Sequence, residues 1–171
     1  MPAEPAVPAE PAEPFDPPGE PWVRVSPRLA TLRRLLAVVT LLVLTAVVAV
    51  PAWFVAPWVA ALVLAVGLAL VGWAWVVVGR TVRSWGYAER AEDLLVTRGV
   101  LQRQLVVVPY GRMQFVDVTA GPLDRRFGLA TVQLHTAAAA TDAQIPGLVP
   151  AEAARLRDRL AARGEAGAAG V

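Results

Sequence analysis

Residues 35–78 decide the fold: LLAVVTLLVLTAVVAVPAWFVAPWVAALVLAVGLALVGWAWVVV. The stretch has no charged residue, and Pro51 and Pro57 divide it into the apolar runs Leu35–Val50 and Trp58–Val78. A membrane-spanning helix needs roughly 17–25 mostly apolar residues. The second run is long enough by itself, and the first becomes long enough if it begins at Leu32. The sequence therefore predicts two transmembrane helices, at about 32–50 and 58–78.

Two other structures fit this stretch less well. A buried helical hairpin in a soluble protein would need a core that covers every uncharged position from Leu35 to Val78, which the rest of a 171-residue chain does not supply. A secretory signal peptide begins close to the N-terminus behind a basic segment, whereas this run follows an acidic segment and is followed at once by a second span. We therefore interpret the stretch as a transmembrane hairpin.

The arginines predict the orientation of the hairpin. Arginines precede the first span and follow the second, and the connecting turn Pro51–Pro57 has no charge. The positive-inside rule then places both termini in the cytoplasm and the turn outside. We expect a multi-pass protein of the cell membrane. The arginines concerned are Arg24, Arg28, Arg33, Arg34, Arg80, Arg83 and Arg90.

Composition excludes several kinds of chemistry. The chain has no cysteine, and all 16 basic residues are arginine. Thiolate metal sites, Schiff-base catalysis by lysine and a P-loop lysine are therefore absent. Nucleic-acid binding lacks any motif. We expect no cofactor, and the abundance of arginine beside the membrane makes anionic lipids natural neighbours.

The chain divides into four segments by composition. We expect residues 1–31 to be a disordered cytoplasmic tail rich in Pro, Ala and Glu, residues 32–79 to form the hairpin, 80–165 to form a small domain, and 166–171 to fray. Gly79-Arg80 is interpreted as a hinge between the hairpin and the domain.

Apolar residues alternate with polar ones after the hairpin, which predicts short antiparallel strands. The expected strands are 85–89, 94–98, 100–108, 113–119, 131–135 and 144–145. A single helical turn at 123–127 ends at Gly128, and an amphipathic helix runs from about Val149 or Pro150 to Arg163, with Gly164 as its stop. These elements predict a small β-barrel whose open end is covered by the C-terminal helix.

Four motifs in this domain resemble the bacterial pleckstrin-homology-like (PH) domain found behind short transmembrane hairpins. They are Asp93–Leu101 (DLLVTRGVL), Val108–Gln114 (VPYGRMQ), Pro122–Leu134 (PLDRRFGLATVQL) and Ile145–Leu148 (IPGL). With the hairpin included, the resemblance covers most of the chain. It implies a split barrel of two orthogonal sheets capped by a C-terminal helix, and it implies no reaction. The Pro-Ala-Glu segment lies outside the pattern.

The candidate site residues are arginines. Arg125 and Arg126 on the short helical turn could pair with a phosphate or a partner's carboxylate, and Arg112 is a third candidate. The alternative is that they are simply solvated. His135 is the only histidine and falls on the polar face of its strand, so we predict neither a catalytic nor a metal site. The first hairpin loop, Glu89–Asp93, is net acidic, which argues against phosphoinositide binding of the eukaryotic PH kind.

Two hypotheses of function remain open. The first is a membrane-tethered, non-enzymatic interaction or assembly module that binds other membrane proteins, which we expect to be encoded by neighbouring genes. The second is binding of anionic lipid headgroups by the arginine-rich domain. Nucleic acid is not an expected partner, and the sequence does not decide the oligomeric state.

Overall fold

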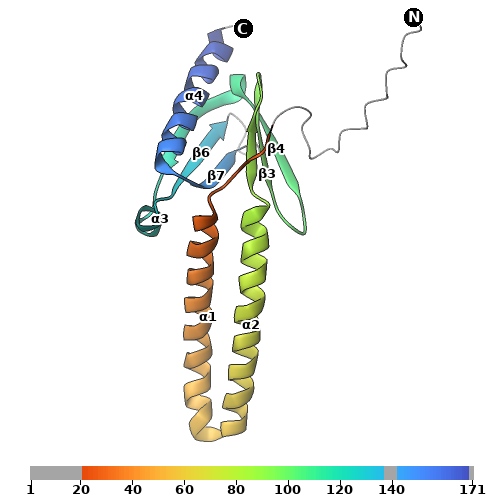
Figure 1. Cartoon of the computed structure of the whole chain (residues 1–171), viewed down its shortest axis with the longest axis vertical. Coiled ribbons are helices and arrows are strands. Elements are labelled where there is room, and N and C mark those ends of the chain that lie inside the picture. Colours follow the sequence, from red (N-terminus) through yellow and green to blue (C-terminus); the bar gives the residue numbers. More distant parts are fainter. Residues whose placement is uncertain (1–20, 137–141, 170–171) are drawn as a thin grey trace, which may run out of the picture.

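The computed structural model describes residues 21–136 and 142–169, with side chains up to Glu165. Two long helices form an antiparallel hairpin, and a domain of strands and shorter helices lies at the end of the hairpin where the chain enters and leaves it (Figure 1). The helices are α1 (Pro27–Val55), α2 (Pro57–Arg83), α3 (Pro122–Phe127) and α4 (Pro150–Ala169), with the 3₁₀ turn η1 (Tyr110–Arg112).

The hairpin turns more tightly than the sequence predicts. We expected the turn to occupy Pro51–Pro57, but α1 continues through Pro51 to Val55, and only Ala56 separates the two helices. Proline removes one backbone donor, yet the following residues still close their bonds, as Ala56 N–H does to the carbonyl of Ala52 at 2.8 Å. Pro57 then begins α2, at the position where proline's missing N–H costs nothing.

Small residues let the two helices approach each other closely. Gly67 is buried against Thr45, where a Cβ atom would overlap the threonine side chain. Ala49 and Ala60 are also buried between the helices. Most other side chains of the hairpin point outward. In an apolar stretch of 18 residues from each helix, only 6% is buried inside the protein. Apolar helices this exposed need hydrocarbon around them, as transmembrane helices have.

Two antiparallel sheets form the domain. The first has the order β1-β2-β3-β4 and the second β5-β6-β7. The backbone N–H of Ser26, next to β1, donates to the carbonyl of Gly147 in β7 at 2.9 Å and joins one corner, whereas β4 and β5 are not paired with each other. The sheets are therefore not closed, as in a split barrel. The strands are β1 (Val23–Arg24), β2 (Gly86–Glu89), β3 (Asp93–Arg98), β4 (Gln104–Pro109), β5 (Met113–Thr119), β6 (Ala130–Thr136) and β7 (Ala143–Leu148).

The β3–β4 connection is longer than we expected. The sequence predicted a strand from Val100, but Arg98 pairs with Gln104, so residues 99–103 form a loop. Gly99 adopts φ +101°, a conformation that glycine tolerates without strain. Val100 and Leu101 look like strand residues because they are apolar, but both are exposed.

The segment before the hairpin is part of the domain, although we expected residues 1–31 to be a tail. Val23 and Arg24 pair with Tyr87 and Gly86 of β2. α1 begins at Pro27, and the Ser26 hydroxyl accepts from the N–H of Arg28 at 3.3 Å. The sequence did not show where the domain begins, because Val23 and Arg24 of β1 come directly after the segment rich in Pro, Ala and Glu. Residues 1–20 lie outside the described part of the chain.

The hairpin and the domain share one core, without a hinge. Leu29 and Leu32 of α1 and Val82 at the end of α2 are all buried, and they belong to the same cluster as Trp85 and the strands. The predicted hinge at Gly79-Arg80 is wrong, since α2 is continuous through both residues. Gly79 serves packing instead, because a Cβ there would overlap the guanidinium of Arg34.

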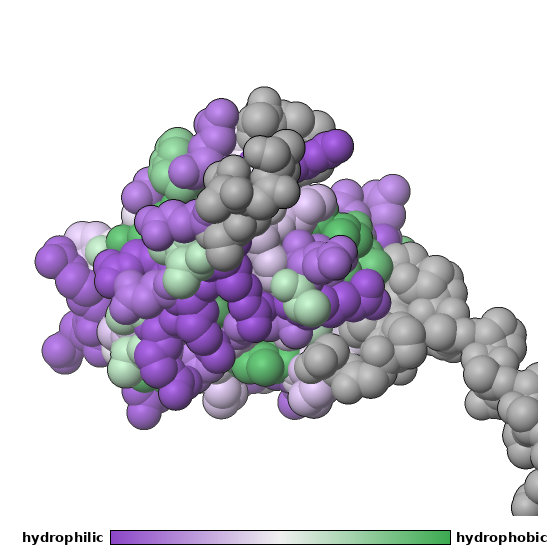
Figure 2. Space-filling model, turned by 90° about the horizontal axis from the view of Figure 1, so that it is seen from above, coloured by the Kyte–Doolittle hydropathy of each residue, from purple (hydrophilic) through white to green (hydrophobic). Residues whose placement is uncertain are grey.

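α4 covers the sheets as predicted but does not stop at Gly164. The sequence predicts an apolar stripe of Val149, Ala153, Leu156 and Leu160; the last three are fully buried as predicted, whereas Val149, just before the helix, is exposed. The helix runs on to Ala169 because four of residues 165–169 are good helix formers, and Gly164 and Gly167 each cost a helix only about 1 kcal/mol. Viewed from the end away from the hairpin, the domain is mostly hydrophilic with small hydrophobic patches (Figure 2). Most of the exposed large apolar side chains belong to the hairpin.

Candidate functional site

The short helix α3 presents Arg125 and Arg126. Pro122 begins the helix, and the Asp124 carboxylate accepts from the backbone N–H of Gly121 at 3.1 Å. Gly128 ends the helix with φ +65°, as the sequence predicted. Both arginines are exposed, and neither forms an ion pair within the described residues. Their guanidinium groups are therefore available to an anionic partner.

The structure does not bring Arg112 together with the other two candidates. Arg112 lies in η1 before β5, while α3 follows β5. A seven-residue strand spans roughly 23 Å, so the two positions are at opposite ends of β5. α3 lies beside the domain end of α1, whereas η1 packs against α4 at the far side of the domain (Figure 1). Arg125 and Arg126 form one candidate surface, and Arg112 is separate from it.

β5 is an edge strand next to α3, and α4 packs against its first half. It pairs with β6 on one side, and the described residues include no strand on its other side. Gln114, Phe115, Asp117 and Thr119 are exposed along it. A groove of about 240 Å³ lies between β5 and α4. An edge with one charged residue and no proline in its middle can accept another strand.

His135 lies on the polar face of β6, as predicted, and makes structural contacts. Its ring stacks on Phe115 with centroids 4.3 Å apart, and its Nδ1 lies 3.5 Å from the carboxylate of Asp142. The same carboxylate accepts from the backbone N–H of Thr136 at 2.8 Å. Within the described residues, no three His, Asp or Glu side chains are placed to hold a metal ion.

A polar network holds α4 to the sheets, and the sequence did not reveal it. Glu89 accepts from Arg159 at 2.9 Å, and Arg163 donates to the hydroxyl of Tyr110 at 2.8 Å. The hydroxyl of Tyr87 lies 3.1 Å from a carboxylate oxygen of Glu152. Arg159 and Arg163 lie outside the buried face of α4, yet both reach back to the domain. The helical period predicts which apolar residues of α4 are buried. It does not predict that long arginine side chains beside them extend to groups on the sheets.

These contacts change the pKa of two tyrosines. Burial raises the pKa of Tyr87, and the negative charge of Glu152 raises it further. Burial also raises the pKa of Tyr110, although Arg163 opposes this by stabilising the phenolate. Both hydroxyls therefore stay protonated at physiological pH. The hydroxyl of Tyr87 donates to Glu152 of α4. The hydroxyl of Tyr110 donates to the carbonyl of Arg90 and accepts from Arg163 of α4.

The structure also gathers arginines that the sequence suggested only as markers of orientation. Arg24, Arg34 and Arg83 come from β1, α1 and α2 and line one cavity where the hairpin meets the domain. Sequence reasoning missed this grouping because Arg24 and Arg83 are 59 positions apart. The only available signal was that each lies near an end of a predicted span.

Comparisons with known proteins agree with this architecture. The family model described as Bacterial PH domain matches residues 29–164, which is about four-fifths of the chain. The UPF0699 transmembrane protein YdbS of Bacillus subtilis (strain 168) is 40% identical over 76 residues. That match covers 44% of this chain and 46% of the relative, so the chain aligns with less than half of the relative's length. No solved structure matches the chain.

Proposed function

This chain belongs to the bacterial PH domain family, and on that premise we propose that it is a non-enzymatic interaction module anchored in the cell membrane. The hairpin holds the PH domain at the inner face, and the domain binds another membrane protein there. The family match and the transmembrane relative support the membrane setting. The choice of a protein partner is our inference from the surface of the domain.

The proposed orientation follows from charge. The domain end of the hairpin carries Arg28, Arg33, Arg34, Arg80 and Arg83, and the turn at the other end has no charged residue. Positive residues beside a span favour the cytoplasmic side. The PH domain and both ends of the chain are therefore placed in the cytoplasm.

The observation that carries the proposal is that the domain is fixed to the hairpin with an open edge. Leu29 and Leu32 anchor α1 in the core of the domain, so the domain keeps one orientation to the membrane. In the part of the chain that the structure describes, no strand pairs with the other side of β5, and Arg125 and Arg126 follow shortly after β5 ends. A partner strand could add to β5 by backbone hydrogen bonds while its carboxylates pair with the two guanidinium groups.

Confinement to the membrane favours this kind of contact. A tethered domain has a raised effective concentration towards other membrane proteins, so weak contacts are sufficient. Catalysis has little support, because the only imidazole is occupied by Phe115 and Asp142. The arrangement favours binding over chemistry.

Photo-crosslinking in native membranes tests the proposal. A photoreactive residue replaces Gln114, which is exposed on β5. We expect one discrete crosslinked membrane protein from the otherwise native chain and its loss in the Arg125→Glu/Arg126→Glu variant. The matched control is Arg155→Glu/Arg157→Glu, which reverses two exposed charges on α4 and should keep the crosslink.

Two results would contradict this function. The first is equal crosslinking by both charge-reversal variants. The second is turnover of a small molecule by the purified chain that His135→Ala abolishes. The first result would remove the role of Arg125 and Arg126, and the second would show that the protein is an enzyme.

One observation favours a second candidate function, binding of anionic lipid headgroups by α3. The helix lies beside the domain end of α1, and Leu123 is 48% exposed next to Arg125 and Arg126 (Figure 1). An exposed leucine beside two arginines suits the boundary between headgroups and acyl chains. Vesicle binding that depends on anionic lipid and on these two arginines, and that weakens with salt, would favour this candidate.

A further inference from the structure

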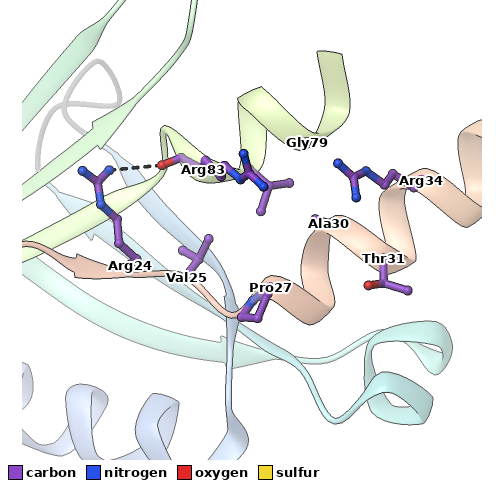
Figure 3. A pocket seen from close by; sticks show the side chains of 9 residues that line it. Arg24, Val25, Pro27, Ala30, Thr31, Arg34, Gly79 and Arg83 are labelled. Carbon is purple, nitrogen blue, oxygen red and sulfur yellow. Dashed lines mark hydrogen bonds between the residues drawn. The ribbon is translucent and has the colours of Figure 1, made fainter. Parts of the chain in front are cut away.

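A cavity of about 500 Å³ lies where β1 and the two long helices meet. Val25, Ala30 and Val82 give it apolar walls, and Thr31 adds a hydroxyl group. Arg34 extends from α1 towards Gly79 of α2 (Figure 3). The remaining lining residues are Pro27, Arg24 and Arg83.

Among the described residues, the lining of the cavity carries positive charge only. It includes three arginines and, in that part of the chain, no acidic residue. None of the three forms an ion pair within the part of the chain that the structure describes. Arg24 donates to the carbonyl of Arg83 at 3.1 Å, and Arg34 donates to the carbonyl of Trp75 at 3.2 Å. A guanidinium has five N–H donors, so most of them remain available to a ligand.

Backbone carbonyls hold two of these arginines, Arg24 and Arg34, in place. Arg34 also lies over the ring of Trp75, with its central carbon 4.6 Å from the ring centroid. The absence of a side chain at Gly79 provides the space for that guanidinium, which a Cβ would occupy. Arg34 is thus positioned before any ligand binds, and an anion that binds here would not have to order it.

The cavity lies at the level of the lipid headgroups. The hydrocarbon core is about 30 Å thick, which corresponds to about 20 helical residues. Counting back from Val55 at the far end of α1 puts the near edge of the core at about Leu36. Arg34 therefore lies at the headgroup boundary, and the cavity extends from there towards β1 (Figure 3).

We propose that this cavity binds the phosphate of an anionic membrane phospholipid from the leaflet that faces the domain. Arg24, Arg34 and Arg83 would bind the phosphate oxygens, because guanidinium groups pair with phosphate through charged hydrogen bonds. The acyl chains would remain beside the hairpin. The site is distinct from α3, and it requires neither a protein partner nor Arg125 and Arg126.

Native mass spectrometry of the full chain in detergent tests this site. The delipidated protein is titrated with phosphatidylglycerol, with phosphatidylcholine as the neutral comparison and glycerol phosphate as the soluble source of the same phosphate. The cavity variant is Arg24→Gln/Arg83→Gln. The matched control is Arg33→Gln/Arg80→Gln, which removes two charges near the same membrane boundary from residues that do not line the cavity.

We expect one saturable site for phosphatidylglycerol, weakened about tenfold or more in the cavity variant, since charged hydrogen bonds to the phosphate are lost. The control should change the affinity less than about threefold, because its charges act only through the general field. Thr31→Trp keeps all three arginines but fills the cavity, and it should weaken binding as much as the cavity variant does. This third variant tests the site even if the double substitution fails to fold.

Three results would overturn the inference. Equal weakening by the cavity and control variants would mean that the arginines act only as a diffuse positive field. Binding of phosphatidylcholine as tight as that of phosphatidylglycerol would exclude recognition of a net negative charge. Binding of glycerol phosphate as tight as that of phosphatidylglycerol would assign the cavity to a soluble phosphate instead of a lipid.

Discussion

Gly147→Ala should destabilise the protein more than the same substitution at another glycine with similar backbone geometry. Gly147 has φ +75°, and a Cβ there would lie 2.7 Å from Cδ2 and 2.8 Å from Cβ of Leu29. Gly128 has φ +65°, but its Cβ would meet only the flexible end of Arg28, at 3.3 Å. Alanine at either position costs about 1–2 kcal/mol for the left-handed backbone. Gly147→Ala alone adds an overlap, which costs about 1–3 kcal/mol in a packed core.

The measurement is thermal unfolding of the full chain in detergent, followed by near-ultraviolet circular dichroism. In a domain of this size, 1 kcal/mol corresponds to about 4–8 °C in the midpoint. Gly147→Ala should therefore unfold at least about 4 °C below Gly128→Ala. Equal midpoints would refute the reasoning, because they would mean that α1 does not pack against β7 through Leu29.

Three further predictions follow from the hairpin, the closing helix and the buried hydroxyl of Tyr87. In otherwise cysteine-free protein on intact cells, Val55→Cys should react with a membrane-impermeant thiol reagent and Ala161→Cys should not; the opposite pattern would reverse the proposed orientation. Leu160→Asp should unfold the domain, since it buries a charge at a fully buried position, whereas Arg157→Ala should keep the melting temperature within a few degrees; similar effects would mean that α4 is not docked. The raised pKa of Tyr87 stabilises the fold below the usual tyrosine pKa of about 10, and this contribution is lost as the pH rises above it. Tyr87→Phe should therefore reduce the loss of melting temperature between about pH 9 and about pH 11, and an unchanged loss would contradict the assignment.

The sequence predicted the elements of the fold well because their signals are local. The uncharged stretch from Leu35 to Val78 predicts a hairpin by length alone. The alternation through β6 predicts which side chains are buried, as Val132 and Leu134 confirm, whereas the inward-facing Val116 and Val118 of β5 are only partly buried. Gly128 was correctly predicted to end α3, since its left-handed backbone has a local cause.

The contacts between elements could not be predicted, because the residues that make them lie far apart in the chain. Gly79 looked like a hinge, but Arg34, from the other long helix, packs against it and α2 continues. β1 is only two residues long and forms because β2 is nearby. A strand this short has no period that a sequence pattern could show.

The candidate arginines show the same difference between local signals and contacts of residues far apart in the chain. Arg125 and Arg126 are adjacent in the sequence, so their common surface follows from one helical turn. Arg24, Arg34 and Arg83 come together only through the hairpin and the pairing of β1. Arg112 appeared to be a third member of the first group, but β5 separates it from α3. Sequence distance was informative within one element and uninformative between elements.

The measurement that tests the central claim most directly is the distance distribution between spin labels on the hairpin and on the domain. Labels at Val55 and Arg157 join the turn of the hairpin to α4, and labels at Gln114 and Arg157 provide a control pair within the domain. Electron–electron double resonance on the full chain in lipid nanodiscs should give both pairs a single narrow distribution of similar width, because Leu29 and Leu32 fix the hairpin in the domain core. A broad or multiple distribution for the first pair beside a narrow one for the control would contradict the claim that the PH domain is held in one orientation at the membrane.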